Sequence, residues 1–304
     1  MLFVIGKIND TANTKGRLTI IGYGILDGSY FDYCTRHNDT VSHLSMIESG
    51  TRPVTIHGLT IYNPSWFMMT NLLPPNSIIK SYKGIGWFLN QDCCGVSTNG
   101  IIQNSFCRTS DDSFKVENGE NIMVKDNVAW QLYTGSIHQL GWYGVNANNI
   151  TIRNIDVIHA EWTGANAESD AILTLTGIWN ASIDMMYSNI IMENIRIDTI
   201  VGRILNLLWR NVSKNVKHEL IDLYIKNVTS REKLKFTTLP GQVGIVEPNQ
   251  RLYIEECDGY CLFDGIYFEN IYINGSKISG NNEIGWNLTE IGSTISILDP
   301  KIQR

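Results

Sequence analysis

Three aspartates are spaced so that they could act together as acid and base. Asp111 and Asp112 are adjacent, and Asp92 lies 19 residues before Asp111. Uncompensated repulsion among three carboxylates in one patch raises the pKa of at least one of them. Carboxylates whose pKa values are separated in this way can cleave a glycosidic bond by general acid/base catalysis.

The elements that would position these aspartates belong to a degenerate repeat of the form Asn-Ile-x-Ile-x-Asn-Ile/Val-x-Val/Ile. The clearest copies are residues 121–128, 149–157, 189–197 and 270–273, and weaker copies are residues 54–61, 100–106 and 220–228. Each copy alternates apolar and polar residues, turns at Asn or Gly and alternates again, which is typical of two short strands that meet at a bend. Successive copies start roughly 20 to 45 residues apart, a period that indicates a solenoid.

The composition agrees with this fold, because the chain contains 41 Ile and 30 Asn residues. We expect an all-β protein, a right-handed parallel β-helix formed by residues 1–304 as a single domain, with Ile and Val inside and Asn at the bends. Leucine-rich repeats would need Leu at fixed places and a helical return segment. An antiparallel β-sandwich would need more hairpin turns than the few Asn-Gly pairs provide. The polar stretch over residues 233–250 is expected to be a long loop between coils.

A β-helix coil of about 19 residues would bring the three aspartates together. Asp92 would lie one strand spacing, roughly 5 Å, from the pair on the next coil. In an undistorted strand Asp111 and Asp112 would point to opposite faces, one of them into the apolar interior. We therefore expect the strand to bend or bulge at this place, so that both carboxylates face outward.

The motifs of this region resemble glycoside hydrolase family 49, the dextranase and isopullulanase family, which is related to the polygalacturonases. The matching segments are Ser-Tyr-Lys to Asn-Gln-Asp over residues 81–92, Arg-Thr-Ser-Asp-Asp-Ser-Phe-Lys over 108–115, Gln-Leu-Gly-Trp over 139–142 and Asp-Val-Ile-His over 156–159. Residues 20–28 resemble an early Gly-x-Gly-x-Leu-x-Gly segment of that family. The chain departs from the pattern at Cys93, where the family usually has Gly, at Arg108, where it often has His, and at Glu117-Asn118, where paired Tyr residues are common.

The resemblance implies an inverting, endo-acting hydrolase of α-glucans such as dextran or pullulan. Asp111 would be the proton donor, while Asp92 and Asp112 would hold and deprotonate the attacking water. The residues expected to bind substrate are Lys115, Trp142, Tyr82, Lys83, Gln139 and His159. For two of them an alternative stays open, because Lys115 could instead neutralise the aspartate pair and His159 could be a polar group at a coil bend. The family typically carries an N-terminal β-sandwich domain, which we do not expect in these 304 residues.

Three alternative functions remain. A polygalacturonase-like pectin hydrolase would need Gly-His-Gly and Arg-x-Lys elements, which are missing at the expected places, and more basic residues to bind uronate carboxylates. A pectate-lyase-like enzyme would use Lys or Arg as base together with bound calcium, which Lys115 keeps open. A non-catalytic polysaccharide-binding β-helix would have no reason to keep three carboxylates together, since clustering them costs stability.

Charge and hydropathy exclude several classes of partner. The net charge is −6 without any Lys/Arg-rich run, so we expect no nucleic-acid partner. No stretch approaches 18 apolar residues, so we expect no membrane span. We expect a monomer that acts on polysaccharide without a cofactor and without a metal, because the paired Cys/His spacing of a zinc site is missing.

Eight Asn-x-Ser/Thr sequons favour a secreted glycoprotein whose signal peptide is absent from these residues. They are Asn9, Asn38, Asn149, Asn180, Asn211, Asn227, Asn274 and Asn287. The six cysteines agree with secretion, because Cys257 and Cys261 could close a small loop. Cys93 and Cys94 are too close for an ordinary disulfide.

Overall fold

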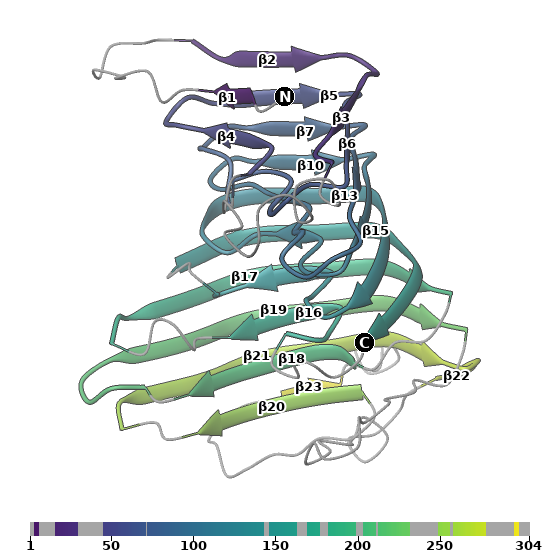
Figure 1. The fold of residues 1–304 in the computed structure, drawn as a ribbon. Coiled ribbons are helices and arrows are strands. Elements are labelled where there is room, and N and C mark those ends of the chain that lie inside the picture. Colours follow the sequence, from purple (N-terminus) through teal and green to yellow (C-terminus); the bar gives the residue numbers. More distant parts are fainter. Residues whose placement is uncertain are drawn as a thin grey trace.

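The computed structural model describes residues 3–5, 16–29, 45–70, 72–142, 146–162, 169–176, 182–198, 203–210, 212–231, 249–255, 258–277 and 295–297. The regular structure in these residues is β-strand, and nearly all strand pairs are parallel. The strands of successive coils stack one above another from β2 to β21 (Figure 1). The predicted all-β parallel β-helix is therefore confirmed. None of the described residues forms a helix that could cross a lipid bilayer.

The largest sheet has 15 strands. Its main path contains β2 (Leu18–Ile21), β5 (Val54–His57), β7 (Ile78–Lys80), β10 (Ile101–Gln103), β13 (Gly119–Tyr133), β15 (Asn146–Trp162), β17 (Met185–Ile197), β19 (Lys217–Ser230), β21 (Tyr260–Ile273) and β22 (Ser276–Lys277). Beside this path lie β3 (Ile25–Asp27), β6 (Thr60–Tyr62), β8 (Lys83–Ile85), β11 (Phe106–Thr109) and β23 (Ile295–Ile297). The long strands β13 and β15 continue across the bend that separates the shorter strands of earlier coils.

A second sheet has six strands. They are β9 (Cys94–Gly95), β12 (Phe114–Lys115), β14 (His138–Leu140), β16 (Leu173–Thr176), β18 (Arg203–Arg210) and β20 (Asn249–Glu255). A separate pair joins β1 (Phe3–Ile5) to β4 (Ile47–Ser49). Of the stretch 233–250 that was predicted as a loop, Asn249 and Gln250 begin β20, and the other residues lie outside the described part of the chain.

Asparagine side chains form two stacks at bends of the coils. One stack consists of Asn76, Asn99, Asn121 and Asn149, and each Nδ2 donates to the preceding Oδ1 over 2.7–3.2 Å. The other runs from Asp126 through Asn154, Asn194, Asn227 and Asn270 with distances of 2.8–3.1 Å. All of these residues have φ between 52° and 63°, a left-handed conformation that Asn and Asp tolerate. The expected role of Asn at the bends is confirmed.

Apolar residues on successive coils fill the interior. The strand register aligns the buried side chains of Ile56, Ile79, Ile102, Val124, Ile152, Met192, Ile225 and Phe268 in one row. Because each side chain packs on the equivalent residue of the next coil, the row forms a continuous core along the axis. This stack fixes the coil spacing, and with it the distance between polar side chains on neighbouring coils.

Candidate active site

The aspartates 92, 111 and 112 lie together at a bend, and we call them the carboxylate trio. One carboxylate oxygen of each lies within 4.8 Å of those of the other two. Residues 110–113 connect β11 to β12, so the pair is not in a regular strand. Phe114 pairs with Cys94, which places Asp112 level with Asp92 of the preceding coil. The predicted clustering and the predicted bend are confirmed, but Asp112 is only 5% exposed, so the expectation that both carboxylates face outward is not met at Asp112.

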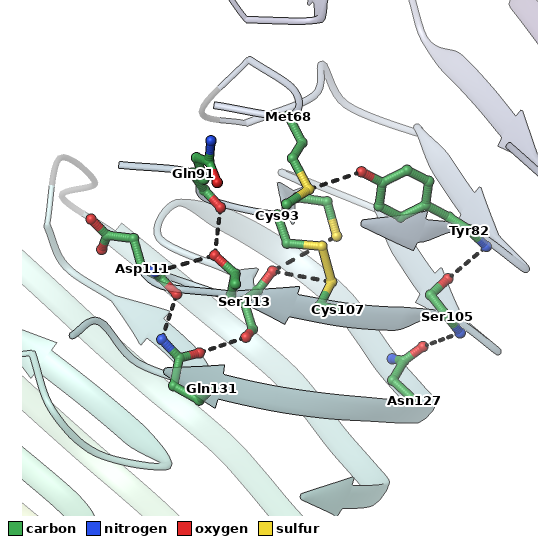
Figure 2. The surroundings of a disulfide bond; sticks show 12 residues. Met68, Tyr82, Gln91, Cys93, Ser105, Cys107, Asp111, Ser113, Asn127 and Gln131 are labelled. Carbon is green, nitrogen blue, oxygen red and sulfur yellow. Dashed lines mark hydrogen bonds between the residues drawn. A yellow bond between two sulfur atoms is a disulfide. The ribbon is translucent and has the colours of Figure 1, made fainter. Parts of the chain in front are cut away.

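Hydrogen bonds hold the bend around Asp111. Its Oδ1 accepts from the backbone nitrogen of Asp112 at 3.0 Å, and its Oδ2 accepts from that of Asn90 at 3.1 Å. Gln131 of the next coil spans the bend, because its Nε2 donates to the Asp111 carbonyl at 2.6 Å and its Oε1 accepts from Ser113 Oγ at 2.7 Å (Figure 2). Gln131 is fully buried, so its hydrogen bonds fix the Asp111 backbone without competition from water.

Gly135 lets the next coil press against the peptide that joins the two adjacent aspartates. A Cβ at this position would lie 2.6 Å from the Asp112 nitrogen, and the φ of Gly135 is +83°. Trp162 fixes the same backbone, because its Nε1 donates to the Gly135 carbonyl at 2.6 Å. Only glycine combines this close approach with this conformation. The sequence interpretation missed Gln131 and Gly135, although a Gly between two strand copies, one coil after the pair, was a usable signal.

A disulfide joins Cys93 to Cys107 beside Ser113 of the bend (Figure 2). It connects the residue after Asp92 to β11, which leads into the bend, and both cysteines are fully buried. The sequence spacing did not indicate this pairing. Cys94 is a free, buried thiol whose pKa is raised by burial. Cys261 is also disulfide-bonded, whereas Cys257 lies outside the described residues.

Burial and mutual repulsion raise the pKa values of the adjacent aspartates. For Asp111, burial is the largest cause, followed by the negative charges of Asp92 and Asp112, and the pKa lies well above its ordinary value. Burial and the charge of Asp92 raise the pKa of Asp112 to about 8. Asp112 Oδ1 accepts from the Ser136 backbone nitrogen at 2.8 Å and from Ser136 Oγ at 3.0 Å. These two bonds orient Asp112 and oppose part of the shift.

Lys115 is the counterion of the trio. Its Nζ lies 2.7 Å from Asp92 Oδ2, and the two side chains are only 2% and 8% exposed. Burial raises the pKa of Asp92 above its ordinary value, and the Lys115 charge opposes only part of this rise. Burial opposes the lysine charge as well, but Asp92, Glu117 and Asp112 outweigh burial and keep the pKa of Lys115 above its ordinary value. Asp92 Oδ1 is buried and accepts no hydrogen bond from the described residues.

The ion pair supports the neutralising role that the sequence left open for Lys115. A side chain this deeply covered and bound to Asp92 does not compete for substrate hydroxyls. The three carboxylates are also a ligand type that divalent cations prefer. A fixed ammonium group already compensates part of their charge, which weakens the trio as a cation site.

Two residues that were predicted to bind substrate are covered. Tyr82 is fully buried, and its hydroxyl contacts the Met68 sulfur at 3.4 Å inside the coil (Figure 2). Gln139 is 1% exposed in β14, opposite Lys115. Neither side chain reaches the surface, so the prediction that they contact substrate is wrong in this structure. The sequence motif placed them near the site but could not show which face they occupy.

The structure does not bring Lys83 or Trp142 to the carboxylate trio. Lys83 is exposed and pairs with Phe106 at the start of β11, so the length of β11, about 10 Å, separates it from the bend. It lines a groove with Ser81, Asn104 and Asp126 that contains no member of the trio. Trp142 follows β14, while the trio lies at the other end of this strand, next to Ser136.

His159 is half-buried on the outer face of β15 and contacts the indole of Trp130 at a tilt of 58°. Its ring centroid lies 5.6 Å from that of Trp130, and its Nε2 lies 3.4 Å from Glu161 Oε2. Its position in a strand, rather than at a coil bend, favours the ligand-contact alternative. No residue of the trio touches it in the contacts described.

Fold and site together define a parallel β-helix that carries a carboxylate trio and its lysine counterion at a bend between two sheets. The chain is 23% identical over 176 residues to a dextranase of Arthrobacter globiformis, covering 52% of this chain and 27% of the relative. It is 22% identical over 172 residues to an isopullulanase of Aspergillus niger, covering 50% of this chain and 30% of the relative. It spans less than a third of the length of these two proteins. No protein-family model matches the sequence.

A solved structure, Dex49A from Penicillium minioluteum, matches the fold. The TM-score is 0.71 at 19% sequence identity, and the match covers 92% of this chain and 50% of that one. The sequence similarities confirm the predicted resemblance to the dextranase and isopullulanase family, and the structural match confirms the fold.

Proposed function

We propose that the protein is an inverting glycoside hydrolase that cleaves α-glucosidic bonds of a polysaccharide such as dextran or pullulan. The observation that carries the proposal is the trio itself, in which burial raises the pKa of all three carboxylates and one of them, Asp92, is bound to a buried lysine. The similarity to a dextranase and an isopullulanase supports the substrate class. Incubation with dextran, pullulan and polygalacturonate, followed by measurement of reducing ends, tests it.

Asp111 is proposed as the general acid. Its raised pKa favours the protonated form, and it is the least buried member of the trio, so it can approach a glycosidic oxygen. Asp92 is proposed as the base, because the charge of Lys115 opposes the rise in its pKa and its Oδ1 accepts no hydrogen bond from the described residues. Asp112 would hold the same water. Activity should fall when pH rises through the pKa of Asp111 and when pH falls far enough to protonate Asp92.

The stereochemical outcome can be tested directly. The trio oxygens lie within 4.8 Å, closer than the separation of about 6.5–9.5 Å that is usual between the acid and the base of inverting enzymes. The carboxylate separation alone would therefore favour a retaining mechanism. However, two carboxylates besides the acid can hold an attacking water, which favours inversion. We expect proton NMR of fresh product to show the β-anomer before mutarotation. An initial α-anomer would indicate a covalent glycosyl-enzyme and contradict inversion.

Secretion and glycosylation are also proposed, and the sequons give a site-specific prediction. Asn149 and Asn227 are rungs of the two asparagine stacks and donate through Nδ2, the atom that would carry a glycan. Asn274 is exposed in the turn between β21 and β22. We expect mass spectrometry of protein from its native host to find a glycan on Asn274 and none on Asn149 or Asn227. A glycan on either rung, with Asn274 bare, would contradict this expectation. The other five sequons lie outside the described residues.

A further inference from the structure

A row of ring and guanidinium side chains crosses successive coils beside the trio. The register places Arg108 opposite Trp130 and Trp130 opposite His159. The guanidinium carbon of Arg108 lies 3.7 Å from the Trp87 ring centroid and 5.4 Å from that of Trp130. Tyr62 extends the row, with its centroid 5.8 Å from that of Trp87. We call Tyr62, Trp87, Arg108, Trp130 and His159 the aromatic row.

A β-bulge brings His159 into the aromatic row. Ala129 pairs with Val157, whereas the next residue, Trp130, pairs with His159, so Ile158 is the additional residue in β15. In a regular register Ile158 would lie opposite Trp130. Bulges redirect side chains and are frequent next to active sites. Here the bulge replaces an aliphatic side chain by a ring with two nitrogen atoms at the end of the row.

The loop over residues 86–92 links the aromatic row to the trio. Trp87 lies near its start, and the loop ends at an aspartate of the trio. Within it, the backbone nitrogen of Asn90 donates to Asp111 Oδ2 at 3.1 Å. The Gln91 side chain stabilises the loop, because its Oε1 accepts a hydrogen bond from the backbone nitrogen of Trp87. One short, internally bonded loop therefore sets the distance between the row and the proposed acid.

Arg108 carries a charge that no carboxylate balances among the described residues. Its Nη1 donates to the Gly86 carbonyl at 2.8 Å, and its pKa is lowered by desolvation. The two indole faces hold the guanidinium by cation–π contacts. The other N–H groups of its fork are donors for a ligand. Trp87 and Tyr62 are 38% and 37% exposed, so the row presents apolar ring surface beside these donors.

We infer that the aromatic row is a saccharide-binding track that extends the active site across the coils. Rings suit the apolar faces of sugars, and Arg108 donates to their hydroxyl groups. The track is assigned a neutral glucan, because Arg108 is the one permanently charged side chain in the row and its guanidinium already contacts two indole faces. The identity of the ligand rests on the proposed function. Arg108 is the member of the row at which this chain departs from the family pattern, which often has His there.

A comparison of a long and a short substrate tests the track. Trp87→Ala and Trp130→Ala should each raise KM for dextran about tenfold, with kcat little changed. Turnover of α-glucosyl fluoride, which is too short to reach the row, should stay the same. Tyr272→Ala is the matched control, since Tyr272 is 36% exposed but lies outside the row. Equal losses on both substrates, or no loss on dextran, would overturn the inference.

A binding measurement separates the track from the catalytic proposal. Electrophoresis through a gel that contains dextran should retard the wild type and Asp111→Asn, but not Trp87→Ala or Arg108→Gln. If the wild type is retarded yet cleaves no glucan, the track stands and the hydrolase proposal fails. If dextran retards none of these proteins, or if polygalacturonate retards the wild type more strongly than dextran, the inferred neutral-glucan track is wrong.

Discussion

Replacing Asp111 with Asn is expected to reduce cleavage of natural α-glucan by about 10³-fold, within the range of about 10²–10⁴ for general acid/base catalysis. The leaving sugar oxygen needs a proton, and an amide cannot supply one. Fluoride leaves without a proton, so the same variant should lose less than about tenfold on α-glucosyl fluoride. Initial rates on the two substrates, measured at one pH, give the ratio that identifies the acid.

Asp126→Asn provides the control for this substitution. Asp126 is exposed on β13 with a φ of 56°, a conformation that Asn tolerates, and its Oδ1 acceptor is retained in Asn. Activity of this control should match the wild type on both substrates. If Asp92→Asn shows the selective loss, while Asp111→Asn loses both activities equally, the acid and base roles are exchanged.

The fold could be predicted because two separate features of the repeat indicate it. Alternating Ile and Val mark the buried face of each strand, and the Asn residues mark the bends, where the structure finds them in the left-handed conformation. Boundaries were harder to predict. In β13 and β15 the strand continues across its bend, so the two short strands expected for residues 121–128 and 149–157 are parts of longer ones.

The trio could be predicted because the number of residues in one coil is close to the number that separates Asp92 from Asp111. The contacts that support it could not be predicted, because they cross coils in ways that spacing does not encode. Lys115 turns toward Asp92 instead of a substrate, and Gln131 crosses the bend from the next coil. The bulge at Ile158 shifts the register by one residue, which no alternation pattern in the sequence marks. Tyr82 and Gln139 were assigned to substrate from motif position, which does not report side-chain direction.

Lys115→Met is expected to have the largest effect on stability. It would leave the buried carboxylate of Asp92 without its partner, and breaking a buried ion pair costs about 3–5 kcal/mol. Lys115, whose pKa is raised in the folded protein, stays charged throughout pH 4–8. The pH dependence of the stability loss in Lys115→Met therefore comes from the carboxylates. Asp112 has a folded pKa of about 8, above its ordinary value of 3.8, so folding is favoured by its protonated form and loses stability as pH rises between these values.

Without Lys115, stability should fall more steeply as pH rises, because the pKa of Asp92 in the folded protein is then raised further. Urea unfolding should show a small difference from the wild type at pH 4 and the full deficit at pH 8. Lys83→Met, which changes an exposed residue, is the control for loss of a lysine charge. Lys115→Met combined with Asp92→Asn should recover part of the stability at pH 8, because the unpaired charge of Asp92 is removed. Lys115 Nζ also lies 4.4 Å from the Phe67 ring centroid. Equal deficits at pH 4 and pH 8 would show that this packing, and not compensation of the trio, is what Lys115 contributes.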